Sequence, residues 1–227
     1  MKQMKQIARA GLLATILLLI TIATTFAADT GEIEVTEGVD GVPYRSRSVA
    51  VATDASGNAV VAWPQHDDIL PNPQKLYIRR YDSSGMPVQL IQVVEKSSSQ
   101  LQGLPDIAMN DSGAFVVAWT EHFTDDDGFS VHAALYDSTG NLVRAPFQVN
   151  TSEAGDQWSP SVAIDDAGNF LVAWDQKDSA FTSVEEEVYA QRYDSTGQPV
   201  GGEVLVNTDT SGYQHQIDVS MAGDGRA

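Results

Sequence analysis

The stretch SVAIDDAGNFLVAW, residues Ser161 to Trp174, decides the fold. A short β-prone run leads into the turn DDAGN, and a dense apolar run, Phe170 to Trp174, follows. In such a turn an Asp side chain accepts a hydrogen bond from a backbone N–H two residues on, and glycine supplies the positive φ of a hairpin. The stretch therefore predicts two antiparallel strands. It leaves open whether its acidic pair, Asp165 and Asp166, has a chemical role.

The same pattern recurs along the chain. Four turn glycines are separated by 56, 55 and 57 residues: Gly57, Gly113, Gly168 and Gly225. A tryptophan lies six residues after each of the first three: Trp63, Trp119 and Trp174. A second glycine series closes the stretches YDSSG, YDSTG and YDSTG: Gly85, Gly140 and Gly197. Three markers at one period indicate an internal repeat of the kind found in solenoids, propellers and other arrays.

Each period has only β-type patterns. In the third copy, four short apolar or alternating runs are separated by turn residues: Ser161–Ile164, Phe170–Trp174, Glu187–Tyr193 and Gly202–Asn207. Four strands without helical periodicity fit one blade of a β-propeller. A linear array of β-sandwich modules is the alternative, but each module needs about seven strands. We therefore predict an all-β fold, a β-propeller-type array of four-stranded blades.

The repeats divide the chain into three blades and two partial segments. Blade 1 covers 46–95, blade 2 covers 104–150 and blade 3 covers 158–207, while 28–45 forms a leader with a partial strand and 213–227 begins a truncated fourth blade. Propellers have about four to eight blades, so three do not close a ring. We expect either a fragment of a longer protein or strands completed by another chain. Open blade edges would also favour self-association.

Residues 1–27 have the layout of a secretory signal peptide. Lys2, Lys5 and Arg9 precede the apolar run Gly11–Ile22, and small residues lead to a cut between Ala27 and Ala28. An uncleaved membrane anchor is the alternative, although the run is short for a span of about 20 residues. The prediction is a secreted bacterial protein, in the periplasm or at the cell surface, without membrane contact after cleavage.

Charge and cysteine content limit the partners. The formal net charge is -18, and loss of the three positive charges of residues 1–27 makes it -21. Such an acidic chain repels nucleic acid and anionic membrane surfaces, so neither is an expected partner. There is no cysteine, so stability must come from a buried core rather than from disulfides.

The turn acids and the tryptophans each have two interpretations. A calcium loop would need several converging oxygens, and the EF-hand pattern with its distal glutamate is absent. Asp166 becomes Ala55 and Gly223 in other copies, which favours a structural turn. The tryptophans are expected to pack between neighbouring sheets; a ring of tryptophans facing a carbohydrate is the alternative.

The loops after each tryptophan vary and are acidic: Pro64–Lys75, Thr120–Ser130 and Asp175–Glu187. Variable loops on a rigid frame often carry binding residues. The candidate Ca²⁺ ligands are Asp67, Asp68, Asp125, Asp126 and Asp127, and the candidate binding residues are His66, His122, Glu185, Glu186 and Glu187. Solvated surface acid is the competing interpretation.

The phrase PSVAIDDAGNFLVAW, followed by VYAQRYDSTGQPVGGEVLVNT, resembles repeats of large, mostly uncharacterised secreted bacterial β-propeller proteins. The resemblance covers nearly all of the chain after Glu32. The hairpin also distantly resembles the Asp-box of sialidase-type propellers, although Trp174 stands farther from Gly168 than that motif places its aromatic residue. The resemblance implies the fold and an extracytoplasmic setting, and it implies no catalytic residues.

Two functions remain open at this point. The first is a non-catalytic propeller segment that binds a protein or a glycan at the cell surface or in extracellular assembly. The alternative is part of a propeller-fold hydrolase or lyase whose active site is completed by residues beyond this chain. No GxSxG, HExxH or phosphate-binding glycine loop is present, and no cofactor other than the candidate Ca²⁺ is expected.

Overall fold

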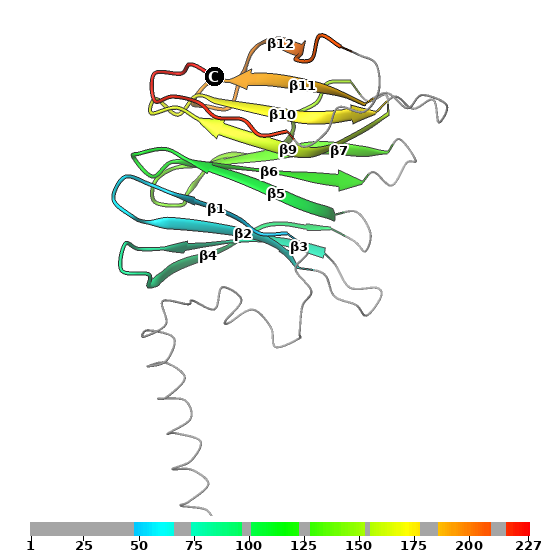
Figure 1. Cartoon of the computed structure of the whole chain (residues 1–227). Helices are drawn as coiled ribbons and strands as arrows, with labels where there is room; N and C mark the ends of the chain where they lie inside the picture. The colour runs from blue at the N-terminus through cyan, green and yellow to red at the C-terminus, as the bar shows by residue number, and fades with distance from the viewer. Residues whose placement is uncertain are drawn as a thin grey trace, which may run out of the picture. The chain divides into compact units, whose positions relative to one another are not determined.

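A computed structural model describes residues 48–65, 74–96, 101–122, 128–152, 155–177, 186–209 and 217–227. The described strands form three four-stranded antiparallel sheets, stacked in chain order (Figure 1). The prediction of an all-β array of four-stranded blades is confirmed. These ranges contain no helix, and so none that could cross a membrane.

In each sheet the strands pair in sequence order. Blade 1 comprises β1 (Ala50–Thr53), β2 (Ala59–Gln65), β3 (Gln74–Tyr81) and β4 (Pro87–Lys96). Blade 2 comprises β5 (Leu101–Met109), β6 (Phe115–His122), β7 (Phe129–Tyr136) and β8 (Leu142–Gln148). Blade 3 comprises β9 (Asp156–Ile164), β10 (Phe170–Lys177), β11 (Glu186–Tyr193) and β12 (Pro199–Leu205).

Neighbouring sheets touch mainly through their first strands. β5 packs against β1 and β2 of the preceding sheet, and β9 packs against β5, β6 and β7. The last strands, β4, β8 and β12, have no comparable packing on one another within the described ranges. The first strands therefore converge on the inner side of the array, as the blades of a propeller do around its axis.

The second strand of a middle blade is buried on both faces. In β6, Val116 and Ala118 belong to the core shared with blade 3, while Phe115, Val117 and Trp119 belong to the core shared with blade 1. Alternate residues of a strand point to opposite faces, so a strand between two sheets must be apolar at every position. This burial explains the continuous run FVVAW.

The tryptophans lie in these cores. Trp63 is 2% exposed, and Trp119 and Trp174 are fully buried. Each ring stacks on the residue opposite it in the third strand, with centroids 5.8, 6.1 and 6.3 Å apart: Tyr77, His132 and Tyr189. The expected packing role is confirmed, and the alternative of a carbohydrate-facing ring of tryptophans is wrong, because the rings have no surface left for a ligand.

The tight turns use the carboxylate as predicted. Asp54 Oδ1 accepts hydrogen bonds from the backbone N–H groups of Ser56 and Asn58, each at 2.9 Å. Asp165 is buried and accepts from the backbone N–H and the side-chain amide of Asn169, at 2.7 and 2.8 Å. Asp166 is exposed and has no such role within its turn. The structural interpretation of the acidic pair is confirmed, and it applies to Asp165.

Replacing Asp165 and Asp166 separately tests this assignment. Asp165→Ala removes the acceptor of two hydrogen bonds at a buried site, and we expect Tm to fall by about 3–8 °C. Asp166→Ala is the matched control, and its Tm should stay within about 1 °C of the parent. Thermal unfolding followed by circular dichroism measures both, and equal shifts would contradict the assignment.

The tryptophans of blades 2 and 3 differ in their indole N–H groups. Trp119 Nε1 donates to the buried Glu121 Oε1 at 2.8 Å, whereas no described group accepts from Trp174 Nε1. Both Trp→Phe variants lose apolar contact, but Trp119→Phe also removes a bond to a buried carboxylate. We expect Trp119→Phe to lower the free energy of unfolding by about 1–3 kcal/mol more than Trp174→Phe, as measured by urea titration. Equal losses would show that the indole–carboxylate bond contributes nothing.

Candidate functional site

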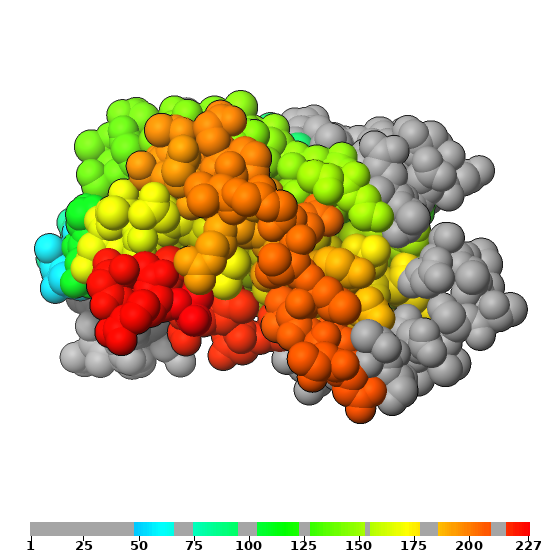
Figure 2. Space-filling model, turned by 90° about the horizontal axis from the view of Figure 1, so that it is seen from above, coloured from blue at the N-terminus to red at the C-terminus, as the bar shows by residue number. Residues whose placement is uncertain are grey.

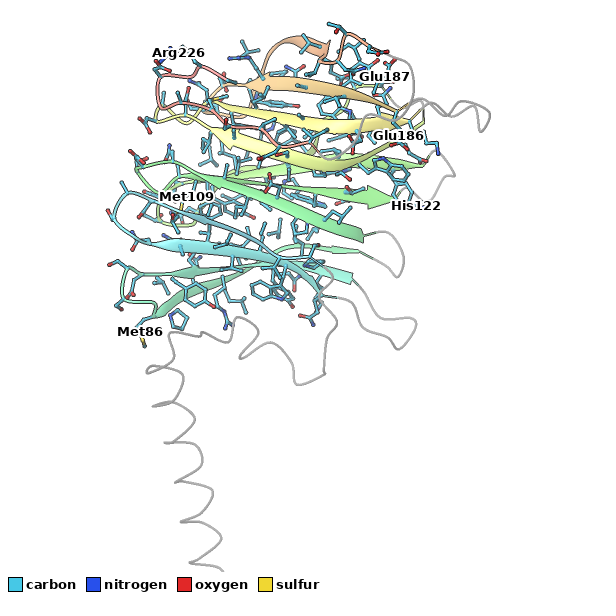
Figure 3. The ribbon with its side chains drawn as sticks, viewed as in Figure 1. Met86, Met109, His122, Glu186, Glu187 and Arg226 are labelled. Carbon is cyan, nitrogen blue, oxygen red and sulfur yellow. The ribbon has the colours of Figure 1, made fainter. Side chains whose placement is uncertain are left out.

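The two ends of the sheets differ. Met86, Met109 and Arg226 lie at the end that carries the tight turns, and His122, Glu186 and Glu187 lie at the other (Figure 3). At this second end the second strand of each blade is followed by the variable loop, and each first strand begins. We call it the loop end. Residues far apart in sequence can meet there because every blade contributes two segments to it.

Most of the candidate ligands predicted from the sequence lie outside the described residues: His66, Asp67, Asp68, Asp125, Asp126, Asp127 and Glu185. His122 lies at the end of β6, with its ring edge-on to Phe129 at 4.9 Å. Glu187 Oε2 accepts a hydrogen bond from the Tyr189 hydroxyl at 3.3 Å. Within the described part of the chain, no three His, Asp or Glu side chains are placed to hold a metal ion. The Ca²⁺ site remains a prediction.

A cavity of about 330 Å³ lies along the first strands, in the middle of β5 and β9. Its wall is built from equivalent positions of successive repeats: Ser48, Leu104–Asp106, Ser159–Ser161 and Ile217–Asp218. Since the first strands converge on the inner side of the array, we call this cavity the axial pocket. Ligands of enzymes and binding proteins commonly occupy concave sites with a few convergent polar groups.

The backbone at this pocket is strained. Leu104 and Ser159 are the described non-glycine residues with positive φ, at 50° and 51°. Each precedes a proline. The strand register shifts at both places, between Gly103 and Asp106 in β5 and between Trp158 and Ser161 in β9. Left-handed backbone at non-glycine residues costs on the order of 1–3 kcal/mol, and it clusters at functional sites together with β-bulges that redirect side chains. Both strained residues line the axial pocket.

Asp106 is the half-buried acid of the pocket. Its Oδ2 accepts hydrogen bonds from the Val162 backbone N–H at 2.8 Å and from the Ser161 hydroxyl at 3.3 Å, which tie β5 to β9. Burial raises the pKa of Asp106 above its usual value, and the negative charge of Asp218 adds to this rise, while the hydrogen bonds oppose it. The pocket thus brings together two carboxyl groups with different environments, because Asp218 is exposed.

Side-chain bonds to the next repeat recur around the pocket. Ser48 Oγ accepts from the Leu104 backbone N–H at 3.2 Å, and Ser161 Oγ accepts from the Val219 backbone N–H at 3.2 Å. Together with the Asp106 bonds, these contacts join each first strand to the following one. The polar groups of the axial pocket are therefore held in place by the packing of successive blades.

The fourth tryptophan, Trp158, packs on an aromatic residue of blade 2 and is not one of the residues that line the pocket. Trp158 is half-buried and directly precedes Ser159 of the wall. Its ring is tilted against Phe129, with centroids 5.4 Å apart, and Phe129 in turn contacts His122. Unlike the three core tryptophans, Trp158 keeps part of its ring exposed.

Sequence reasoning missed Asp106 and Asp218 because it looked for chemistry in the loops after each tryptophan. A usable signal was present at their repeat position, which holds Ala50, Asp106, Ser161 and Asp218 in successive copies. The position is otherwise part of an apolar, strand-like context, so a recurring polar residue there indicates a shared role. What the repeat alone could not supply was the convergence of three of these positions, Asp106, Ser161 and Asp218, on one pocket.

The fold, but no close sequence relative, is found among known proteins. No protein-family model and no curated protein matches the sequence. A Penicillium chrysogenum α-L-arabinanase solved with arabinobiose matches 83% of this chain and 59% of its own, with a TM-score of 0.55 and 9% identity. The chain thus spans less than two thirds of the length of that enzyme. At this identity the likeness shows a shared propeller fold and nothing more.

Weaker structural matches have differing activities. The GH93 α-L-arabinofuranosidase of Fusarium graminearum with arabinobiose has a TM-score of 0.47 and 12% identity, over 75% of this chain and 52% of its own. A mutant apocarotenoid oxygenase of Synechocystis also has a TM-score of 0.47. It is 10% identical and matches 77% of this chain and 41% of its own. The Asp-box link to sialidases finds no support in these matches.

Removing the charge of Asp218 tests the electrostatics of the pocket. Because that charge raises the pKa of Asp106, Asp218→Asn should lower the pKa of Asp106 toward its ordinary value. Carboxyl ¹³C NMR titration measures this directly, and Asp166→Asn, at the turn end, is the matched control. An unchanged Asp106 pKa in Asp218→Asn would show that the two groups do not interact.

Proposed function

We propose that this chain is part of a propeller-fold glycan-active hydrolase, with the axial pocket as its glycan site. The observation that carries the proposal is the pairing of Asp106 and Asp218 at the converging first strands, in a pocket walled by strained backbone. Perturbed carboxyl groups in a cleft are candidates for acid–base roles. The alternative of a purely structural pair does not account for strain at both Leu104 and Ser159.

Hydrolysis of a glycosidic bond requires two carboxyl groups in opposite protonation states. One is protonated and donates its proton to the leaving oxygen, and the other is ionised and acts as base or nucleophile. Asp106 suits the donor role because burial favours its neutral form. Asp218 is exposed and suits the ionised role, and its charge in turn helps Asp106 to keep its proton.

The surroundings suit a sugar rather than a highly charged or wholly apolar ligand. Serines line the wall at Ser48, Ser159 and Ser161, and Trp158, which precedes Ser159 in β9, is half-buried and offers part of an aromatic ring. Such a combination offers hydrogen bonds to hydroxyl groups and an apolar face for the ring of a sugar. The acidic net charge disfavours polyanionic substrates, so a neutral polysaccharide is the preferred class.

The activity is tested on neutral polysaccharides, beginning with arabinan because a fold relative was solved with arabinobiose. We expect release of reducing ends, and Asp106→Asn should reduce kcat by about 10²-fold or more with KM little changed. Asp166→Asn, an acid at the opposite end, should keep full activity. Hydrolysis that survives in Asp106→Asn would contradict the assigned role.

A non-catalytic glycan-binding site is the second candidate. It is favoured by the two hydrogen bonds from blade 3 that engage Asp106 Oδ2 and give it a structural role. In that case the migration of the chain is retarded in gels that contain the polysaccharide, and no reducing ends are released. Trp158→Ala should abolish the retardation. If the chain neither hydrolyses any neutral polysaccharide nor is retarded by one, both candidate functions are wrong.

A further inference from the structure

At both internal blade boundaries an arginine of the preceding blade lies against the second tight turn of the next blade. Arg80 of β3 donates from both terminal nitrogens to the carbonyl oxygens of Ser138 and Thr139, in the DSTG turn of blade 2. Gly140 allows this approach, because a Cβ there would stand 2.9 Å from Arg80 Cδ. At the boundary of blades 2 and 3 a different arginine, Arg144 of β8, packs against the equivalent turn, with its Cδ 2.5 Å from the position of a Cβ on Gly197, and no described group accepts from its Nη1.

The same turn also packs on the first turn of its own blade. A Cβ placed on Gly57, Gly113 or Gly168 would stand 3.5, 3.3 or 3.1 Å from the Cβ of a serine in the second turn: Ser83, Ser138 and Ser195. A DS[ST]G turn is therefore held on two sides, by an arginine of the preceding blade and by a turn glycine of its own.

Both kinds of partner recur at the last described blade face, an arginine in β11 and a turn glycine after β12. Arg192 is the repeat equivalent of Arg80, and its side chain is exposed. Gly225 is the equivalent of Gly57, Gly113 and Gly168, and the atoms near its Cβ position belong to Asp165 rather than to a serine. Arg192 and Gly225 line a cavity of about 370 Å³ that also contacts Tyr193 and Asp224. We call this cavity the turn socket.

The C-terminal segment already forms one side of a further blade. Residues 217–227 lie along blade 3 in Figure 2 and bond to it through the Asp166 N–H to Gly223 O and the Val219 N–H to Ser161 Oγ. The Ala222–Gly225 stretch closes the same type of turn as its equivalents, with the Gly225 N–H donating to Ala222 O at 2.8 Å. The socket thus has the geometry of a blade boundary whose second turn comes from elsewhere.

We infer that this face of blade 3 is a docking surface for the second, third and fourth strands of a further repeat of this type. The DS[ST]G turn of that repeat would pack on Gly225, and Arg192 would exchange its long bond to the Gly225 carbonyl oxygen, at 3.4 Å, for bonds to the two central carbonyl oxygens of the turn. The occupant is specified by the packing of a second-turn serine on a first-turn glycine, which recurs in all three blades, and by the arginine–carbonyl contact at the boundary of blades 1 and 2. This surface lies at the turn end and is separate from the axial pocket.

The test extends the full chain by a second copy of residues 171–207 placed directly after Ala227, which aligns Gly225 with Gly168. We expect the added segment to resist limited proteolysis and Tm to rise by about 5 °C or more, because stability in repeat proteins grows with each interface. Digestion of the added segment with an unchanged Tm would overturn the inference.

Arg192→Leu then tests the contact itself. Leucine is the natural residue at the equivalent position of blade 2, Leu135, so the substitution suits the strand. Tm should fall by about 3–6 °C in the extended chain and by less than about 1 °C in the natural chain. Arg80→Leu is the positive control and should lower Tm in both. Equal effects of Arg192→Leu in the two chains would place the role of Arg192 within blade 3 and overturn the assigned contact.

Discussion

Burial of the second strands on both faces is the constraint on which the rest of this structure depends. A strand such as β6 has apolar side chains on each side, and neither side can be left to water without losing the free energy of apolar burial. Each sheet is therefore stable only between neighbours. Stacking of successive sheets, with a tryptophan and an aromatic or histidine partner in each, follows from that requirement.

The stacking also positions the polar groups. Since neighbouring sheets meet at their first strands, side chains at one repeat position can bond to the backbone of the following blade, as Asp106 does with Val162 and Ser161 with Val219. The same convergence places Asp218 near Asp106 and raises the pKa of the latter. A carboxyl group that would be ordinary on an isolated hairpin becomes a candidate proton donor because of the blade beside it.

The tight turns are stabilised by local hydrogen bonds rather than by apolar burial. Their carboxylates are satisfied locally, so Asp137 is held by the Thr139 hydroxyl and the Asn141 N–H, which lower its pKa to about 2. Acids of this kind are structural, even where two of them stand together beside a glycine. Two half-buried arginines at the turn end, Arg80 and Arg144, extend from one blade to the turn of the next.

The repeat, the strand types and the turn chemistry were all predictable from the sequence. Periodic glycines and tryptophans indicate the blade, and Asp or Asn before glycine indicates the hairpin, because these features act over a few residues and do not depend on distant contacts. The comparison of copies, in which Asp166 is not retained, also favoured a structural turn over a chemical role for the acidic pair. The same local logic directed attention to the loop acids and away from the first strands.

The sequence by itself therefore determined the all-β repeat and the buried role of its tryptophans. Only the tertiary structure decided which polar residues meet. Asp106, Ser161 and Asp218 lie about one repeat apart in the chain, and they share a pocket because inner strands converge where the sheets are packed. Likewise, Arg80 and the turn at Ser138 are distant in sequence, and their contact exists because apolar burial fixes the register of one blade against the next.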